Sequence, residues 1–83
     1  MSETIRVKVL FFGAVADEVG RRVDELEVRT GDPSKSIFDR LLSDYPSLST
    51  HKLLFSVNQN YATGKETLKT GDELAIFTAV SGG

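Results

Sequence analysis

Few side chains in this sequence have the types and spacing that catalysis needs. Its 83 residues include one histidine and no cysteine, which excludes a thiolate nucleophile, a disulfide framework and a cysteine zinc site. His51 is the one good candidate base for a serine nucleophile, and Ser47, Ser49 and Ser56 are its neighbours in sequence. Loop serines are common, so we interpret His51 as a hydrogen-bonded or solvent-exposed residue.

The acidic residues and glycines also predict no site within the domain. Acidic pairs occur at Asp17-Glu18, Asp24-Glu25 and Asp72-Glu73, but neighbouring residues of a strand point to opposite faces, so we interpret these pairs as surface charge. Gly31 and Gly71 are isolated, whereas a phosphate-binding loop needs several glycines that open a helix. We therefore expect no metal site and no bound cofactor.

The reactive feature is the end of the sequence, Ala79-Val80-Ser81-Gly82-Gly83. Domain termini are commonly irregular, but a Gly-Gly pair directly after a predicted strand is unusual. Two glycines lack side chains and can enter a narrow tunnel of a partner enzyme. The α-carboxylate of Gly83 is unhindered and can attack the α-phosphate of ATP to form an acyl-adenylate.

The composition predicts one small cytosolic domain. Ten basic and twelve acidic residues give a net charge of −2, and the basic residues are scattered, with Arg21-Arg22 the only adjacent pair. This pattern does not favour a nucleic-acid partner, because binding a phosphate backbone requires a stripe of basic residues. The longest apolar run, Val9–Phe12, is far shorter than the ~20 residues that span a membrane. Residues 1–4 also lack the pattern of a signal peptide.

Hydrophobic periodicity predicts strands separated by two helices. Residues 5–12 alternate, with Val9 and Phe11 on one face and Phe12 on the other, which is typical of a strand. A short helix is expected over 14–19, and a second strand over 23–28.

A long helix should follow, with Asp32 as its N-cap, Pro33 in its first turn and Pro46 just after its end. Beyond it we expect a strand over 53–57, a turn over 58–60, a short return strand from Tyr61 and a last strand over 73–78.

This order predicts an α+β fold of the β-grasp (ubiquitin-like) type, a mixed sheet with one long crossover helix. A ferredoxin-like fold is the alternative, but it needs a second long helix and residues 58–72 offer none. We expect a β-grasp domain over residues 1–78 and a flexible Gly-Gly carrier tail over residues 79–83.

Several blocks of the sequence resemble the small subunit of molybdopterin synthase, the MoaD family of sulfur carriers. The blocks are Lys8–Gly13, Leu41-Leu42 with Tyr45–Leu48, Val57–Gln59 with Tyr61, Lys69–Ala75, and Val80–Gly83. Of these blocks, the Gly-Asp-Glu block at 71–73 and the tail are the ones most specific to the family. The family commonly has two prolines before its tail, where this sequence has Thr78 and Ala79.

The resemblance implies a subunit that is not catalytic alone. An E1-like enzyme would use ATP to adenylate Gly83, and a sulfurtransferase would convert it to a thiocarboxylate. The tail, with Gly82 beside the reactive residue, would enter the large synthase subunit and donate sulfur to cyclic pyranopterin monophosphate. The implied assembly is a heterotetramer around a dimer of large subunits.

A docking patch is expected beside the tail. If Phe11 and Ile76 face the core, Phe12 and Phe77 face outward, and the first and last strands of a β-grasp sheet are parallel neighbours. Tyr61 is a third member by resemblance, and Ala79, Val80 and Ser81 continue the contact along the tail. A bulge that buries one of the two phenylalanines is the alternative.

Three other functions stay open. The chain could be a thiazole-pathway sulfur carrier, a ubiquitin-like protein modifier, or an interaction domain whose Gly-Gly end has no role.

Overall fold

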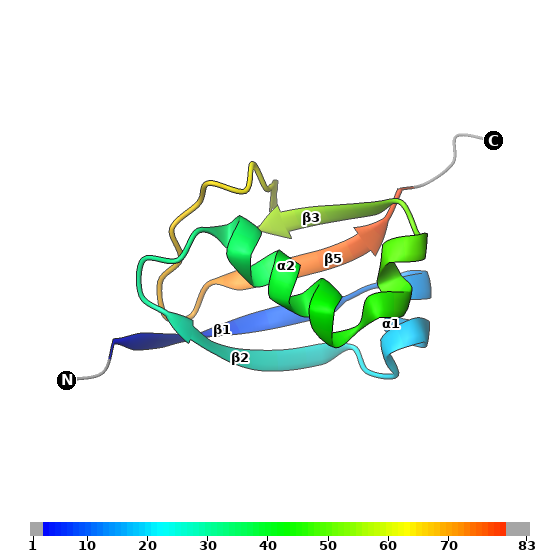
Figure 1. The fold of residues 1–83 in the computed structure, drawn as a ribbon, viewed down its shortest axis with the longest axis horizontal. Coiled ribbons are helices and arrows are strands. Elements are labelled where there is room, and N and C mark those ends of the chain that lie inside the picture. Colours follow the sequence, from blue (N-terminus) through cyan, green and yellow to red (C-terminus); the bar gives the residue numbers. More distant parts are fainter. Residues whose placement is uncertain (1–2, 80–83) are drawn as a thin grey trace.

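The structure, a computed structural model, describes residues 3–79 (Figure 1). Its elements in chain order are β1 (Thr4–Phe11), α1 (Gly13–Val19), β2 (Val23–Arg29), α2 (Ser34–Asp44), the 3₁₀ helix η1 (Pro46–Thr50), β3 (Leu53–Val57), β4 (Asn60–Tyr61) and β5 (Glu73–Thr78). No helix among these residues has the length and apolar character that crossing a membrane requires.

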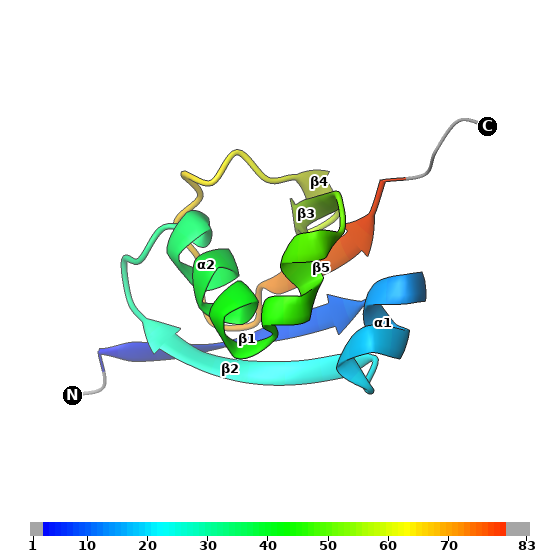
Figure 2. The same cartoon turned by 45° about the vertical axis from the view of Figure 1, so that its right-hand side comes forward.

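The five strands form one mixed sheet in the order β2-β1-β5-β3-β4. β1 pairs with β5 in parallel, and the other neighbours pair antiparallel. The helix α2 lies across one face of this sheet (Figures 1 and 2). The predicted β-grasp fold is therefore confirmed. Within the described residues α1 is only seven residues long, so the second long helix of a ferredoxin-like fold is absent.

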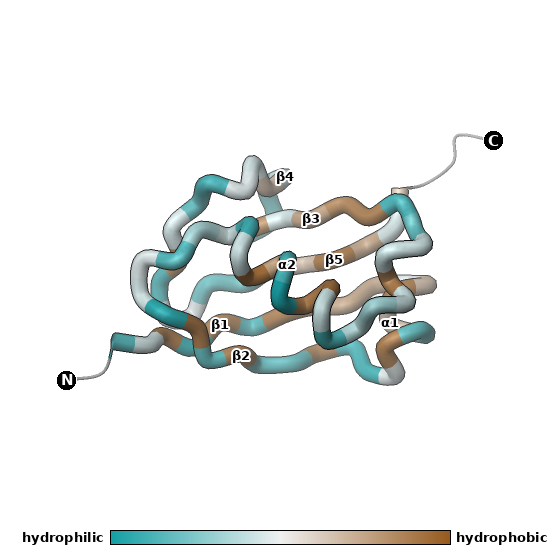
Figure 3. Tube along the Cα trace, in the orientation of Figure 1, coloured by the Kyte–Doolittle hydropathy of each residue, from teal (hydrophilic) through white to brown (hydrophobic). Residues whose placement is uncertain are grey.

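The core lies between the sheet and α2, because alternate strand residues face the helix. Figure 3 shows hydrophobic segments along β1, β3 and β5 and hydrophilic segments over the loops. Phe38 of α2 packs on Phe55 of β3 with ring centroids 4.2 Å apart. The buried strand residues that face α2 are Val7, Val9, Phe11, Leu26, Val28, Val57, Leu74 and Ile76. Ser56 and Ala75, which are register partners on the other face, are also buried. The set that faces α2 confirms the alternation that the sequence predicts for the first and last strands.

The start of α2 differs from the prediction. The helix begins at Ser34, and Pro33 is its N-cap with extended backbone and no side-chain cap. The backbone N–H of Asp32 instead donates to the carbonyl of Arg29, in a turn after β2. The prediction of Asp32 as the cap was wrong, because a distant loop satisfies the first amides of the helix.

That distant loop holds the helix through Glu66. The Ser34 hydroxyl, which is fully buried, donates to Glu66 Oε1 at 2.6 Å, and the Thr63 N–H donates to Glu66 Oε2 at 2.7 Å. The Ser34 N–H donates to the Glu66 carbonyl, and the Lys35 N–H donates to the Gly64 carbonyl. Gly64 has φ +91°, and a Cβ there would lie 3.3 Å from Lys35 Cβ, so the close approach favours glycine.

Two further boundaries differ slightly from the expectation. Asn58 and Gln59 both have positive φ, 49° and 73°, so they alone form the tight turn and the return strand starts at Asn60. The Asn58 side chain accepts from the Glu73 N–H at 2.9 Å, which ties this turn to the start of β5. The 3₁₀ helix that begins at Pro46 was not predicted.

Glu66 should make stability depend on acidic pH. The Ser34 hydroxyl, and after it the Thr63 N–H, lower the pKa of Glu66 from 4.5 to about 2. Because the folded pKa is depressed, the stabilising contribution is fully present above 4.5 and is lost as the pH falls toward 2. We expect Glu66→Gln to lower the urea midpoint at neutral pH and the difference from wild type to shrink toward pH 2, measured by circular dichroism.

Glu3→Gln is the matched control, because Glu3 is exposed at the edge of the domain. The substitution removes the same charge as Glu66→Gln does. It should follow the wild type across the whole pH range. Equal midpoints for Glu66→Gln and wild type at neutral pH would contradict the prediction.

Candidate functional site

One row of side chains crosses the sheet on the face away from α2. In neighbouring strands, residues that are register partners point to the same face. The pairs Leu10 with Val23, Leu10 with Ala75, Ser56 with Ala75, and Ser56 with Tyr61 are such partners. The row therefore runs across all five strands and is mostly apolar.

A second apolar row lies closer to the end of β5. Leu54 is the register partner of Phe77, and Phe12 directly follows the pair Phe11–Ile76. Phe12 is 50% exposed and Tyr61 is 71% exposed, while Leu54 and Phe77 are half-buried. The Tyr61 and Phe77 rings are in contact, with centroids 6.3 Å apart.

We call these residues the outer apolar surface: Leu10, Phe12, Leu54, Tyr61, Ala75 and Phe77. The ladder between β1 and β5 is continuous, so no bulge buries Phe12 or Phe77, and both face outward as the alternation predicts. Phe12 is joined to β5 through its N–H, which donates to the Ile76 carbonyl at 3.2 Å. Aromatic side chains exposed together on a small domain are typical of a docking surface.

The other half of the same face is charged. Lys8 pairs across the ladder with Glu73 on one side and Glu25 on the other, and Arg6 pairs with Glu27. Opposite charges at such positions suit a solvated face. The outer face therefore divides into a charged half, where β5 begins, and an apolar half, where β5 ends.

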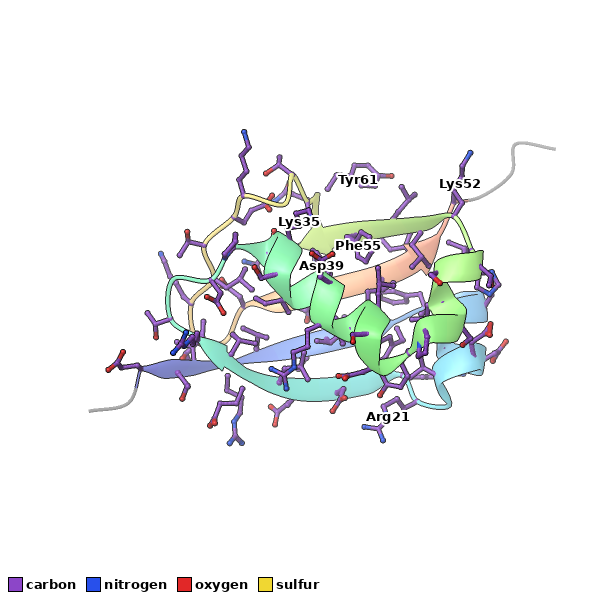
Figure 4. All side chains as sticks on the ribbon, viewed as in Figure 1. Arg21, Lys35, Asp39, Lys52, Phe55 and Tyr61 are labelled. Carbon is purple, nitrogen blue, oxygen red and sulfur yellow. The ribbon has the colours of Figure 1, made fainter. Side chains whose placement is uncertain are left out.

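The end of β5 is held by β3. The Ala79 N–H donates to the Lys52 carbonyl at 3.0 Å, one residue beyond the last strand pair, Leu53 with Thr78. Lys52 lies beside the end of β5 (Figure 4). A proline at position 79 has no N–H and could not make this bond. This hydrogen bond therefore fixes Ala79 to the end of β3.

The remaining predicted tail residues, Val80, Ser81, Gly82 and Gly83, lie outside the described residues. Their roles, and the boundary between domain and tail, stay predictions. Ala79 is the last described residue, and it lies at the apolar end of the sheet.

His51 pairs with a carboxylate. One of its ring nitrogens, Nε2, lies 2.8 Å from Glu18 Oε1, which joins the end of η1 to α1. The hydrogen bond with His51 lowers the pKa of Glu18. This pairing agrees with the interpretation of His51 as a hydrogen-bonded residue. Residues 3–79 contain no group of three or more potential metal ligands.

Three residues of the outer apolar surface, Leu10, Leu54 and Ala75, were not among the predicted site residues. Ala75 precedes Phe77 by two, so the alternation of the last strand could have found it. Leu10 precedes Phe12 by two in the alternating strand, so the same period-two pattern could have found it. Leu54 could not be found this way, because its place depends on the register of β3 against β5.

Fold and surface together define a class of protein, a ubiquitin-like β-grasp domain with an apolar outer surface beside its C-terminal strand. Residues 9–83 match the model of the ThiS family. The chain belongs to this family of small ubiquitin-like sulfur carriers.

One curated relative and two solved structures are also similar to this chain, the first in sequence and the other two in fold. The molybdopterin synthase sulfur carrier subunit of Chlamydomonas reinhardtii is 30% identical over 83 residues, which cover 95% of this chain and 100% of the relative. SAMP1 from Haloferax volcanii, a small archaeal modifier protein, has a TM-score of 0.81 and 26% identity over 94% of this chain and 99% of that chain.

The second solved structure is a complex of subunits 1 and 2 of the molybdopterin-converting factor from Helicobacter pylori. It has a TM-score of 0.63 and 20% identity, and the match covers 95% of this chain and 100% of that chain. At this identity the likeness shows the fold.

The bond between Ala79 and Lys52 predicts slow amide exchange at the base of the tail. We expect the Ala79 amide to exchange at least about tenfold more slowly than that of Gln59 in the turn before β4, because the Ala79 N–H must first leave its acceptor. Hydrogen-exchange NMR on the full chain measures both. Equal rates would mean that Ala79 is not held by β3.

Proposed function

We propose that this protein is the sulfur-carrier small subunit of a molybdopterin synthase. The observation that carries the proposal is the outer apolar surface beside Ala79, from which the sequence runs four residues to Gly83. A partner that covers this surface would receive the Gly-Gly end at the same time. Family membership and the curated sulfur carriers support it.

The chemistry would take place on the carboxyl group of Gly83. Its oxygen attacks the α-phosphorus of ATP, an acyl–phosphate bond forms, and pyrophosphate leaves. Sulfur at the oxidation level of sulfide, brought by a sulfurtransferase, then attacks the acyl carbon. AMP leaves and a thiocarboxylate remains on Gly83.

Sulfur donation would then complete the cycle. The thiocarboxylate is ionised at neutral pH and is a good sulfur nucleophile. Its acceptor is cyclic pyranopterin monophosphate, and two donations build one dithiolene. The proposal assigns ATP binding, the acids and bases, and the cations to the partner proteins, in the cytoplasm.

The large subunit is the proposed partner for the outer apolar surface. The Helicobacter pylori complex, in which subunits 1 and 2 of the molybdopterin-converting factor bind each other, supports such a partner. Burial of Phe12, Tyr61 and Phe77 would contribute most of the binding free energy, since aromatic side chains dominate interface hot spots. The proposed assembly is a heterotetramer with a central dimer of large subunits.

A ubiquitin-like protein modifier is the second candidate function. The likeness to SAMP1, a small archaeal modifier protein, favours it. A modifier would use the same adenylated Gly83 but transfer it to a lysine amine, forming an isopeptide bond. A thiazole-pathway carrier would differ only in the acceptor of its sulfur.

The decisive experiment is intact-mass measurement. The full chain is incubated with ATP, an E1-like enzyme and sodium sulfide. We expect the mass increase of one oxygen-to-sulfur exchange, and none in a variant that lacks Gly83, because only that carboxyl group would be activated.

The alternatives give other results. Conjugates of high mass that require Gly83 would favour the modifier. A deletion strain that keeps its molybdoenzyme activity but needs thiazole would favour the thiazole carrier. Full function in cells of the variant without Gly83 would overturn every carrier reading.

Phe77→Ala should separate docking from folding. We expect it to weaken binding to the large subunit by about tenfold or more, as loss of an interface aromatic does, while the domain stays folded. Phe11→Ala, the matched control from the core, should instead cost about 3–5 kcal/mol of stability. Calorimetric titration and thermal unfolding measure the two effects, and unfolding of Phe77→Ala would contradict the outward assignment.

A further inference from the structure

A groove continues the outer apolar surface past Phe12 to the start of β2. Its volume is about 540 Å³, and it lies between the end of β1, the helix α1 and the first residues of β2. Leu10 and Phe12 belong both to this groove and to the outer apolar surface, and Val23, which is 51% exposed, extends the apolar lining. The groove and the surface are therefore one continuous face.

Two charged residues, Arg22 and Asp17, also line this groove. The neighbouring Arg21 is paired with Asp24 at 3.3 Å, and Figure 4 shows Arg21 near the end of β2 that adjoins α1. Arg22 has no carboxylate within ion-pair distance among residues 3–79, so Asp17 forms no ion pair with it. Its backbone is nevertheless held, since the Arg22 carbonyl accepts from the Phe11 N–H at 2.9 Å.

We propose that Arg22 selects the docking partner by binding a carboxylate that stands next to an apolar side chain on the partner protein. The apolar side chain would cover Leu10, Phe12 and Val23, and the carboxylate would reach the guanidinium. This inference rests on the proposed function and names the chemistry that the docking face recognises beyond its aromatic residues.

The charges of the groove favour a single carboxylate. A guanidinium offers a planar fork of donors that matches a carboxylate, and it is weakly hydrated, so it suits an interface. Asp17 in the same groove disfavours a ligand with several negative charges, such as a nucleotide or a nucleic-acid backbone. An apolar lining with one unpaired cation at its edge is the complement of an acidic residue beside an aliphatic or aromatic one.

The test compares two charge reversals, one just before β2 and one at its last residue. Arg22→Glu changes the groove, and Arg29→Glu makes the same change in net charge at the other end of β2. At about 3.3 Å per residue the two positions are roughly 20 Å apart. Binding of the full chain to the large subunit encoded in the same genome is measured by calorimetric titration, with folding checked by circular dichroism.

We expect Arg22→Glu to weaken binding about tenfold or more and Arg29→Glu to change it less than about twofold. Arg22→Lys should fall between Arg22→Glu and wild type, because it keeps the charge but loses the fork. The loss in Arg22→Glu should shrink as the ionic strength rises from about 0.1 M to about 1 M, where the Debye length falls from about 10 Å to about 3 Å.

The other outcomes overturn the inference in ways that can be told apart. Equal losses for Arg22→Glu and Arg29→Glu would show a long-range charge effect only. Unchanged binding of Arg22→Glu, with weaker binding of Phe77→Ala, would remove the role of Arg22 and leave the proposed docking intact. No binding by the wild-type chain would overturn the docking proposal itself. A change only in self-association, seen by analytical ultracentrifugation, would assign the groove to a second copy of this chain.

Discussion

The parallel pairing of β1 with β5 is the constraint on which the rest of this structure depends. With Phe11 opposite Ile76, both side chains enter the core, and the next residues, Phe12 and Phe77, face away from α2. A shift of β5 by one residue would send Leu74 and Ile76 to solvent and bury Phe77. One register therefore sets the core and the outer apolar surface together.

The same pairing decides at which end of the sheet a partner would contact the tail. β5 ends beside the last residues of β1 and the first residues of β3, and the Ala79–Lys52 bond carries the pairing one residue further. The apolar half of the outer face lies at this end and the charged half at the other. Binding free energy from the sheet would then be available to hold the tail in a partner, which offsets the entropy lost when a tail is ordered.

Much of the fold could be predicted because its signals are local. Alternation along residues 5–12 and 73–78 depends only on the period of a strand, so both the strands and their inward faces were predicted correctly. The start of α2 could not be predicted in this way. Its first amides are satisfied by the loop at 64–66, and Ser34 bonds Glu66 across 32 residues of sequence, so Asp32 was not needed as a cap.

The sequence by itself determined the family motifs, the Gly82-Gly83 end and which strand residues face inward or outward. The tertiary structure alone decided which outward residues become neighbours: Leu54 beside Phe77, Tyr61 in contact with Phe77, and Arg22 at the edge of an apolar groove. The physical reason is that the facing of a side chain repeats along one strand, whereas its lateral neighbours follow from the register between strands. That register is set by long-range packing of the whole core.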